Sequence, residues 1–115
     1  MANFKPLKNY ILFCIDHLID NYDLKGPFID IGCGTGDVSA HLGNRGWSGK
    51  AIDLSGPAIA EASYNLRNYK NIKVEQSDVT KIKEKYKTML LLDILEHTKD
   101  DLDLLSKSLD CMDDD

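Results

Sequence analysis

The sequence predicts an α/β fold, a Rossmann-like doubly wound parallel sheet with helices on both faces. Four short apolar segments alternate with segments of helical periodicity, and the first apolar segment runs directly into a glycine-rich stretch. Strands that alternate with helices are joined by right-handed crossovers, which gives a three-layer α/β/α arrangement. Ligands of such folds bind at the carboxyl ends of the strands. The four predicted strands are residues 28–31, 49–55, 71–79 and 88–95.

An N-terminal helix is expected before the sheet, within residues 1–25. Its apolar residues recur at helical spacing, which is typical of an amphipathic helix with one face against a core. Gly26-Pro27 ends this segment and separates it from the first strand. The residues expected on the buried face are Leu7, Tyr10, Ile11, Cys14, Ile15, Leu18 and Tyr22.

Three further helices are expected along the chain. Residues 37–45 form a short helix after the first strand. Ser55 is a predicted N-cap of the helix after the second strand, with Pro57 tolerated in its first turn. After the fourth strand, Thr98 and Asp101 resemble a capping box. They predict a last helix that leads into the acidic end of the chain, residues 98–115 in all.

Length and composition predict one domain, residues 1–115, with its core at 28–97. A net charge of −5 argues against a protein that binds nucleic-acid phosphates. The sequence shows no signal peptide and no apolar run of ~18 residues, so we expect a cytoplasmic protein without membrane contact. The three cysteines have no metal-like spacing, so they predict free thiols and no metal site.

The stretch "FIDIGCGTGD" places three glycines where the first strand turns into a helix: Gly32, Gly34 and Gly36. Glycine lets a ligand approach the backbone, and the helix N-terminus beyond it offers N–H groups to an anionic group. The dinucleotide fingerprint is G-x-G-x-x-G, whereas Asp37 occupies the third fingerprint position here. A second acid, Asp30, precedes the first glycine by two residues.

This D-x-G-x-G-x-G motif resembles that of the class I S-adenosylmethionine-dependent methyltransferases. Three later stretches resemble the strand ends of the same family: "AIDLS", "QSDV" and "LLLDILEH", the last being similar to its small-molecule branch. All four motifs lie in the family's order within residues 28–97. The resemblance implies S-adenosylmethionine as cofactor and methyl transfer to a small-molecule acceptor.

The resemblance also implies a role for several residues in cofactor binding. Asp53 would bind the ribose hydroxyls, because a carboxylate at a strand end can accept two hydrogen bonds from a cis-diol. The Asp78 carboxylate and the Val79 N–H would hold the adenine, and Asp30 would lie near the ammonium and sulfonium charges. The complete set expected to bind the cofactor is Asp30, Gly32, Cys33, Gly34, Gly36, Asp53, Leu54, Asp78, Val79 and Leu91.

No catalytic constellation stands out in the sequence. Methyl transfer from a sulfonium is an in-line displacement, so positioning supplies most of the catalysis. A base is needed only when the acceptor must lose a proton. His97 is the candidate for contact with the substrate or for a general base. The alternative is that His97 is a polar residue where the fourth strand ends and a helix begins.

Members of this family commonly continue with further strands, whereas the predicted elements stop after the helix that follows strand four. Strand four would then be an apolar sheet edge. We expect a fragment of a longer protein, a homo-oligomer formed through this edge, or strands supplied by another chain. Two alternatives to an enzyme stay open: a non-catalytic S-adenosylmethionine-binding or interaction module, and an NAD-binding half-domain, against which Asp30 and Asp37 argue.

Overall fold

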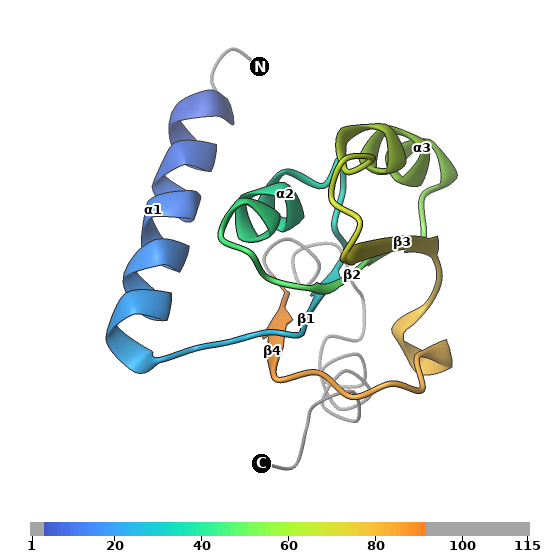
Figure 1. Cartoon of the computed structure of the whole chain (residues 1–115). Coiled ribbons are helices and arrows are strands. Elements are labelled where there is room, and N and C mark those ends of the chain that lie inside the picture. Colours follow the sequence, from blue (N-terminus) through green and yellow to red (C-terminus); the bar gives the residue numbers. More distant parts are fainter. Residues whose placement is uncertain (1–3, 92–115) are drawn as a thin grey trace.

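A computed structural model describes the backbone of residues 4–91 and the side chains of residues 11–91 (Figure 1). In this part of the chain, all strands form one parallel sheet in the order β3-β2-β1-β4. The predicted Rossmann-like parallel sheet is therefore confirmed. The strands are β1 (Phe28–Ile31), β2 (Gly49–Asp53), β3 (Ile72–Gln76) and β4 (Thr88–Leu90).

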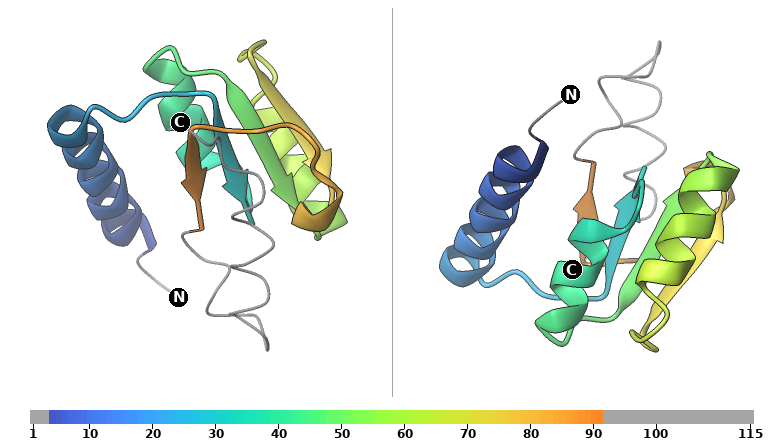
Figure 2. Two further views of the ribbon diagram at one scale, coloured as in Figure 1. Left: turned by 90° about the horizontal axis from the view of Figure 1, so that it is seen from below. Right: turned by 90° about the horizontal axis from the view of Figure 1, so that it is seen from above.

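The helices α1 (Phe4–Tyr22), α2 (Asp37–Asn44) and α3 (Gly56–Asn65) lie on one face of the sheet, as Figure 2 shows. On the other face, where a second helical layer was also expected, the described residues place the connection from β3 to β4, which includes the short 3₁₀ helix η1 (Val79–Lys81). Successive side chains of a strand point to opposite faces. Phe28 accordingly packs with the helices, whereas Ile29 packs in a second core cluster on the other face.

The carboxyl ends of β2 and β3 differ from the predicted ranges. β2 ends at Asp53, and Ser55 caps α3 as predicted, because its Oγ accepts a hydrogen bond from the Ala58 N–H at 3.3 Å. β3 ends at Gln76 instead of residue 79. The reason is that Asp78 caps η1, its Oδ1 accepting from the Thr80 N–H at 2.9 Å.

β4 covers the beginning of the fourth predicted strand. Thr88–Leu90 are paired with β1, and Leu91 follows the strand. The rest of that predicted strand, the capping box at Thr98 and the last helix lie outside the described residues. β4 is the outer strand on its side of the sheet within residues 4–91. Self-association through this edge stays a prediction.

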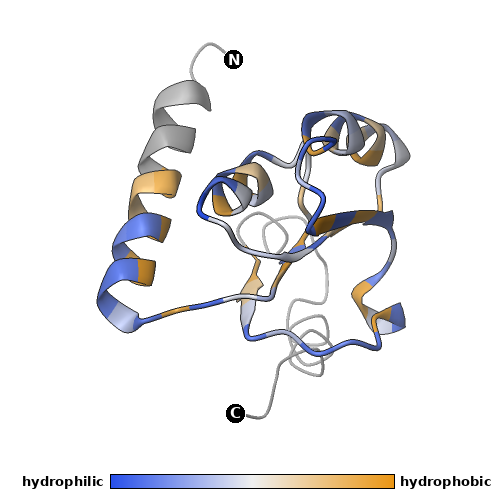
Figure 3. Cartoon of the chain, viewed as in Figure 1, coloured by the Kyte–Doolittle hydropathy of each residue, from blue (hydrophilic) through white to orange (hydrophobic). Residues whose placement is uncertain are grey.

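The buried face of α1 was predicted only in part. Ile15 and Ile19 are buried in the core under the helices, and Ile11 packs against it. Leu18 and Tyr22, which were expected on the buried face, are 47% and 69% exposed, so the predicted face was wrong at these two positions. Figure 3 shows hydrophobic and hydrophilic residues alternating around the lower turns of α1. An apolar cavity of about 50 Å³ lies between α1, α2 and β4, and the residues of α1 that line it are Ile15, Leu18 and Ile19, so Leu18 faces the cavity with part of its side chain.

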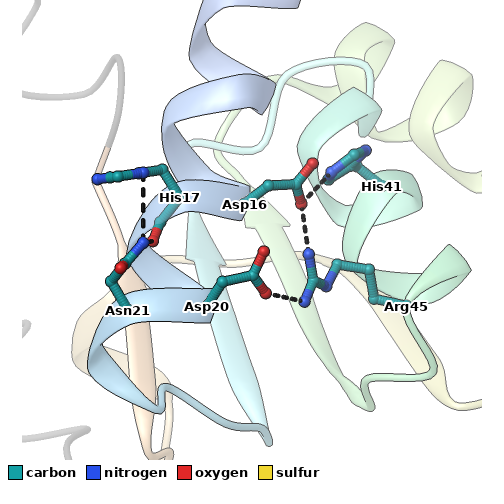
Figure 4. Close-up of polar contacts among 6 residues, drawn as sticks. All are labelled: Asp16, His17, Asp20, Asn21, His41 and Arg45. Carbon is teal, nitrogen blue, oxygen red and sulfur yellow. Dashed lines mark hydrogen bonds and ion pairs between the residues drawn. The ribbon is translucent and has the colours of Figure 1, made fainter.

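A hydrogen bond of His41 and ion pairs of Arg45, the residue after α2, connect α1 to α2 beside this apolar contact (Figure 4). Asp16 Oδ1 lies 2.8 Å from His41 Nε2 and 2.8 Å from Arg45 Nη1, and Asp20 Oδ1 lies 2.7 Å from Arg45 Nη2. The hydrogen bond with His41, aided by Arg45 and opposed by desolvation, lowers the pKa of Asp16.

Among the described residues, no helix is long and apolar enough to cross a membrane.

Candidate functional site

The glycine turn after β1 has a backbone conformation that other residues adopt at a cost. Gly32, Gly34 and Gly36 have φ angles of +74°, +57° and +87°. These values lie in the left-handed region, which glycine enters without a steric penalty. The turn is held against β2, because the Gly32 and Cys33 N–H groups both donate to the Ile52 carbonyl oxygen at 2.9 Å.

Gly34 and Gly36 face different surroundings. A Cβ added at Gly34 would meet no heavy atom within 4 Å, so a ligand has room to approach this part of the backbone. A Cβ at Gly36 would lie 3.0 Å from Leu66 Cδ1 and 3.4 Å from Ala62 Cβ. Gly36, predicted to bind the cofactor, therefore also allows α3 to pack closely against the turn.

Asp53 joins the end of β2 to the glycine turn. The Gly34 N–H donates to Asp53 Oδ2 at 2.9 Å, and the Ser55 N–H donates to Oδ1 at 2.9 Å. These bonds fix both oxygens of a half-buried carboxylate beside the open face of Gly34. Each carboxylate oxygen has two acceptor positions, so the pair retains capacity for further donors such as a diol.

The end of β3 lies next to the end of β2. The Ser77 N–H donates to the Asp53 carbonyl oxygen at 3.1 Å, which places Asp78 one residue from that junction. The Val79 side chain is buried in the second core cluster. Leu54, the other predicted residue here, is 68% exposed, and its carbonyl oxygen accepts from Gln76 Nε2 at 3.1 Å.

Asp30 and Cys33 lie deeper in the same edge of the sheet. Asp30 is 4% exposed, and its Oδ2 accepts from the hydroxyl of buried Ser39 of α2 at 2.8 Å. Burial, followed by the charges of Asp30 and Asp53, raises the pKa of the Cys33 thiol to about 12. The thiol is therefore protonated at neutral pH. The carboxylates of Asp30 and Asp53 thus both lie close enough to Cys33 to act on its thiol.

The structure therefore gathers most of the predicted residues at one edge of the sheet. The glycine turn, Asp53 and the start of the β3–β4 connection are linked directly by hydrogen bonds. Leu91 follows β4 and packs against the second core cluster. His97 lies outside the described residues, so its role stays a prediction. Within residues 4–91, no group of three or more His, Cys, Asp or Glu side chains could hold a metal ion.

Three supporting residues were not identified from the sequence: Ser39, Gln76 and Ser77. Each is a small or neutral polar residue whose partner lies on another element. The burial of Ser39 opposite Asp30 depends on how α2 packs on β1. The only sequence signal was a polar residue in the first turn of a helix, which is too common to indicate a site.

A parallel sheet with a glycine turn after its first strand, and an acid at the end of the next strand, defines a Rossmann-like cofactor-binding domain. A family model is more specific: the model described as "Methyltransferase domain" matches residues 8–115. The chain belongs to this methyltransferase family, which confirms the resemblance that the motifs predicted.

The proteins similar to this chain include two curated relatives and a solved structure. Ubiquinone biosynthesis O-methyltransferase of Pelagibacter ubique (strain HTCC1062) is 29% identical over 114 residues, covering 86% of this chain and 48% of the relative. Chloroplastic magnesium protoporphyrin IX methyltransferase of Arabidopsis thaliana is 31% identical over 102 residues, covering 84% and 31%. The chain thus spans about half of the first relative and about a third of the second.

The solved structure is magnesium protoporphyrin IX methyltransferase (ChlM) from Synechocystis PCC 6803 with bound SAH. It superimposes with a TM-score of 0.79 at 23% identity and covers 98% of this chain and 57% of that chain. At this level of identity the likeness supports the fold of the sheet and its helices.

Proposed function

We propose that the carboxyl edge of this sheet binds S-adenosylmethionine, and that the chain supplies the cofactor-binding part of a methyltransferase that acts on a small-molecule acceptor. The observation that carries the proposal is the 2.9 Å hydrogen bond from the Gly34 N–H to Asp53 Oδ2. It brings the open backbone of the turn and a fixed diol acceptor into one place. Family membership supports the same cofactor.

Each part of the edge suits one part of an adenosyl amino acid. Asp53 accepts hydrogen bonds from the ribose hydroxyls while its bonds to Gly34 and Ser55 keep it in place. The turn at Asp78 and Val79 lies beside it and contacts the adenine. The carboxylates of Asp30 and Asp53 suit the ammonium and sulfonium charges of the cofactor.

The bound cofactor supplies an electrophilic methyl group on sulfur, and the chain holds that group in line with the acceptor. The two curated relatives are named for ubiquinone biosynthesis and for magnesium protoporphyrin IX. Both names support a small-molecule acceptor here. His97 is the proposed contact with that acceptor, and it acts as a base only if the acceptor loses a proton.

Calorimetric titration with S-adenosylhomocysteine (SAH) tests the proposal. We expect measurable binding by the wild type and at least about tenfold weaker binding by Asp53→Ala, since a hydrogen bond to a charged acceptor contributes about 1.5–3 kcal/mol. Glu61→Ala is the matched control, because it removes the same charge from an exposed position of α3. Its affinity should equal that of the wild type.

Three outcomes would contradict parts of the proposal. Equal affinities of wild type and Asp53→Ala would remove Asp53 from the site. Binding of NAD in a parallel titration, without binding of SAH, would favour the dinucleotide alternative. Binding of S-adenosylmethionine without methyl transfer to any acceptor tested would favour a non-catalytic module.

A further inference from the structure

Lys50 is a buried cation near the amino end of β2, an inner strand of the parallel sheet. It is the second residue of β2, is 7% exposed, and shares the face of Ile52, away from the helices. Its Nζ donates to Glu84 Oε1 at 2.9 Å and to Glu75 Oε1 at 3.4 Å. A buried ammonium is costly without partners, so these two carboxylates account for its presence. The proposed function gives Lys50 no role.

The connection from β3 to β4 presents one side to the sheet and the other to solvent. Ile82 and Tyr86 pack against the second core cluster, and Glu84 between them reaches Lys50. This alternation places a row of exposed lysines outward: Lys81, Lys83, Lys85 and Lys87. The Glu84 side chain is itself 55% exposed, but its carboxylate turns toward the sheet and contacts the buried charge of Lys50.

The two carboxylates that contact Lys50 differ in what holds them. Glu75 lies in β3, where its position is fixed by the pairing with Ile52. Glu84 lies in the connection, outside any strand, and its Oε2 also accepts from the Lys83 N–H at 3.1 Å. The hydrogen bond from Lys50 is the main cause that lowers the pKa of Glu84 to about 2. The bond to Glu84 therefore links a rigid strand to an irregular segment and is ionic at neutral pH.

This segment begins at the proposed adenine turn. Asp78 and Val79 form a tight turn in which the Lys81 N–H donates to the Asp78 carbonyl oxygen at 2.9 Å, and the Ile82 N–H donates to that of Val79 at 3.2 Å. The turn is fixed at its start by the bond from Ser77 to Asp53. The first polar side-chain contact with the sheet beyond it, within the described residues, is that of Glu84 with Lys50.

We propose that the ion pair of Lys50 and Glu84 holds the β3–β4 connection so that Asp78 and Val79 face the adenine ring, which makes these two charged residues positioning residues for the cofactor. This inference rests on the proposed function. It gives the buried lysine a role in the selectivity of the site for adenine. Glu75, in contrast, serves only to compensate the charge of the lysine.

The test compares Glu84→Gln with Glu75→Gln, since each variant removes one carboxylate charge from the same lysine. Affinities are measured for SAH and for S-inosylhomocysteine, in which an oxygen replaces the adenine amine. We expect Glu84→Gln to weaken SAH binding by at least about fivefold and to reduce the preference over the inosyl analogue, as the loss of one positioned hydrogen bond would. Glu75→Gln should stay within about twofold of the wild type.

An equal loss of affinity for both ligands, or the same behaviour in both variants, would overturn the positioning role, because a merely structural ion pair would give those results. If Glu84→Gln unfolds at the assay temperature, Glu84→Asp replaces it, since it keeps the charge and shortens the reach. The same loss of selectivity is then expected, and an unchanged preference overturns the proposal.

Amide hydrogen exchange separates this inference from the proposed function. Glu84→Gln should exchange faster than Glu75→Gln at Thr80, Lys81 and Ile82, whose N–H groups close the turn. If the wild type does not bind SAH, the proposed function fails, and the exchange rates still decide whether the ion pair holds the turn. Equal rates in the two variants would overturn the positioning role.

Discussion

Replacing Gly34 by alanine tests whether the open face of the glycine turn is a binding surface. Gly34 has φ +57°, and a Cβ there would meet no heavy atom within 4 Å. The substitution therefore costs the folded protein only the left-handed backbone conformation, about 1–2 kcal/mol. For a domain of this size, between the ranges for smaller and larger domains, 1 kcal/mol lowers Tm by about 4 °C. The new methyl group occupies the space where we place the ligand.

Gly46 provides a matched control for this substitution. It has φ +85°, also with nothing within 4 Å of an added Cβ, but it lies after α2 and outside the glycine turn. Gly34→Ala and Gly46→Ala should therefore lose similar stability in thermal unfolding followed by circular dichroism. Only Gly34→Ala should lose affinity for SAH, by at least about tenfold, or 1.4 kcal/mol. Equal affinities of the two variants would refute the assignment of this surface.

Three further predictions concern stability. Gly49→Ala should lower the free energy of unfolding, measured with urea, by about 1–3 kcal/mol through overpacking. The added Cβ would overlap the Phe28 ring and lie 2.5 Å from the Phe28 carbonyl oxygen. An unchanged free energy of unfolding would contradict that packing. The pKa of Glu84 is lowered from 4.5 to about 2, so its ion pair stabilises the protein above the unfolded pKa, and this contribution is lost as pH falls through the folded pKa. Glu84→Gln should be less stable than wild type at pH 7, and the gap should close toward pH 2; a gap that does not vary with pH would exclude this linkage. Asp16→Asn weakens the contacts of α1 with α2 and should therefore speed amide hydrogen exchange in α1. Exchange rates in α1 equal to those of the wild type would contradict this prediction.

The sequence predicted the parts of the fold that depend on neighbouring residues. β1 was predicted at its observed ends because an apolar run stands between Gly-Pro and glycines, and the cap at Ser55 follows from its own turn. The face of α1 depends on the position of α2 and β4, so Leu18 was misplaced and Ile19 was missed. Periodicity alone shows that a helix has an apolar face, whereas the neighbouring elements decide which of its residues are buried.

The residues of the candidate site also differ in how far the sequence could predict them. The motif order indicated Asp53 because a strand end carries its residue to a known edge of the sheet. The packing of α3 against Gly36 and the contact of Glu84 with Lys50 join residues far apart in the chain. A lysine in an apolar strand gives no sign of its partner, because the partner lies in an irregular connection.

The central claim is that an adenosyl amino acid binds where the glycine turn meets the ends of β2 and β3. Amide chemical shifts of the ¹⁵N-labelled wild-type chain, recorded during titration with SAH, test it most directly. We predict the largest changes at Gly34, Leu54, Asp78 and Val79, with none along α1 near Asn21. Saturating SAH that leaves these four amides unshifted, or that shifts only residues around the apolar cavity beside α1, would contradict the account.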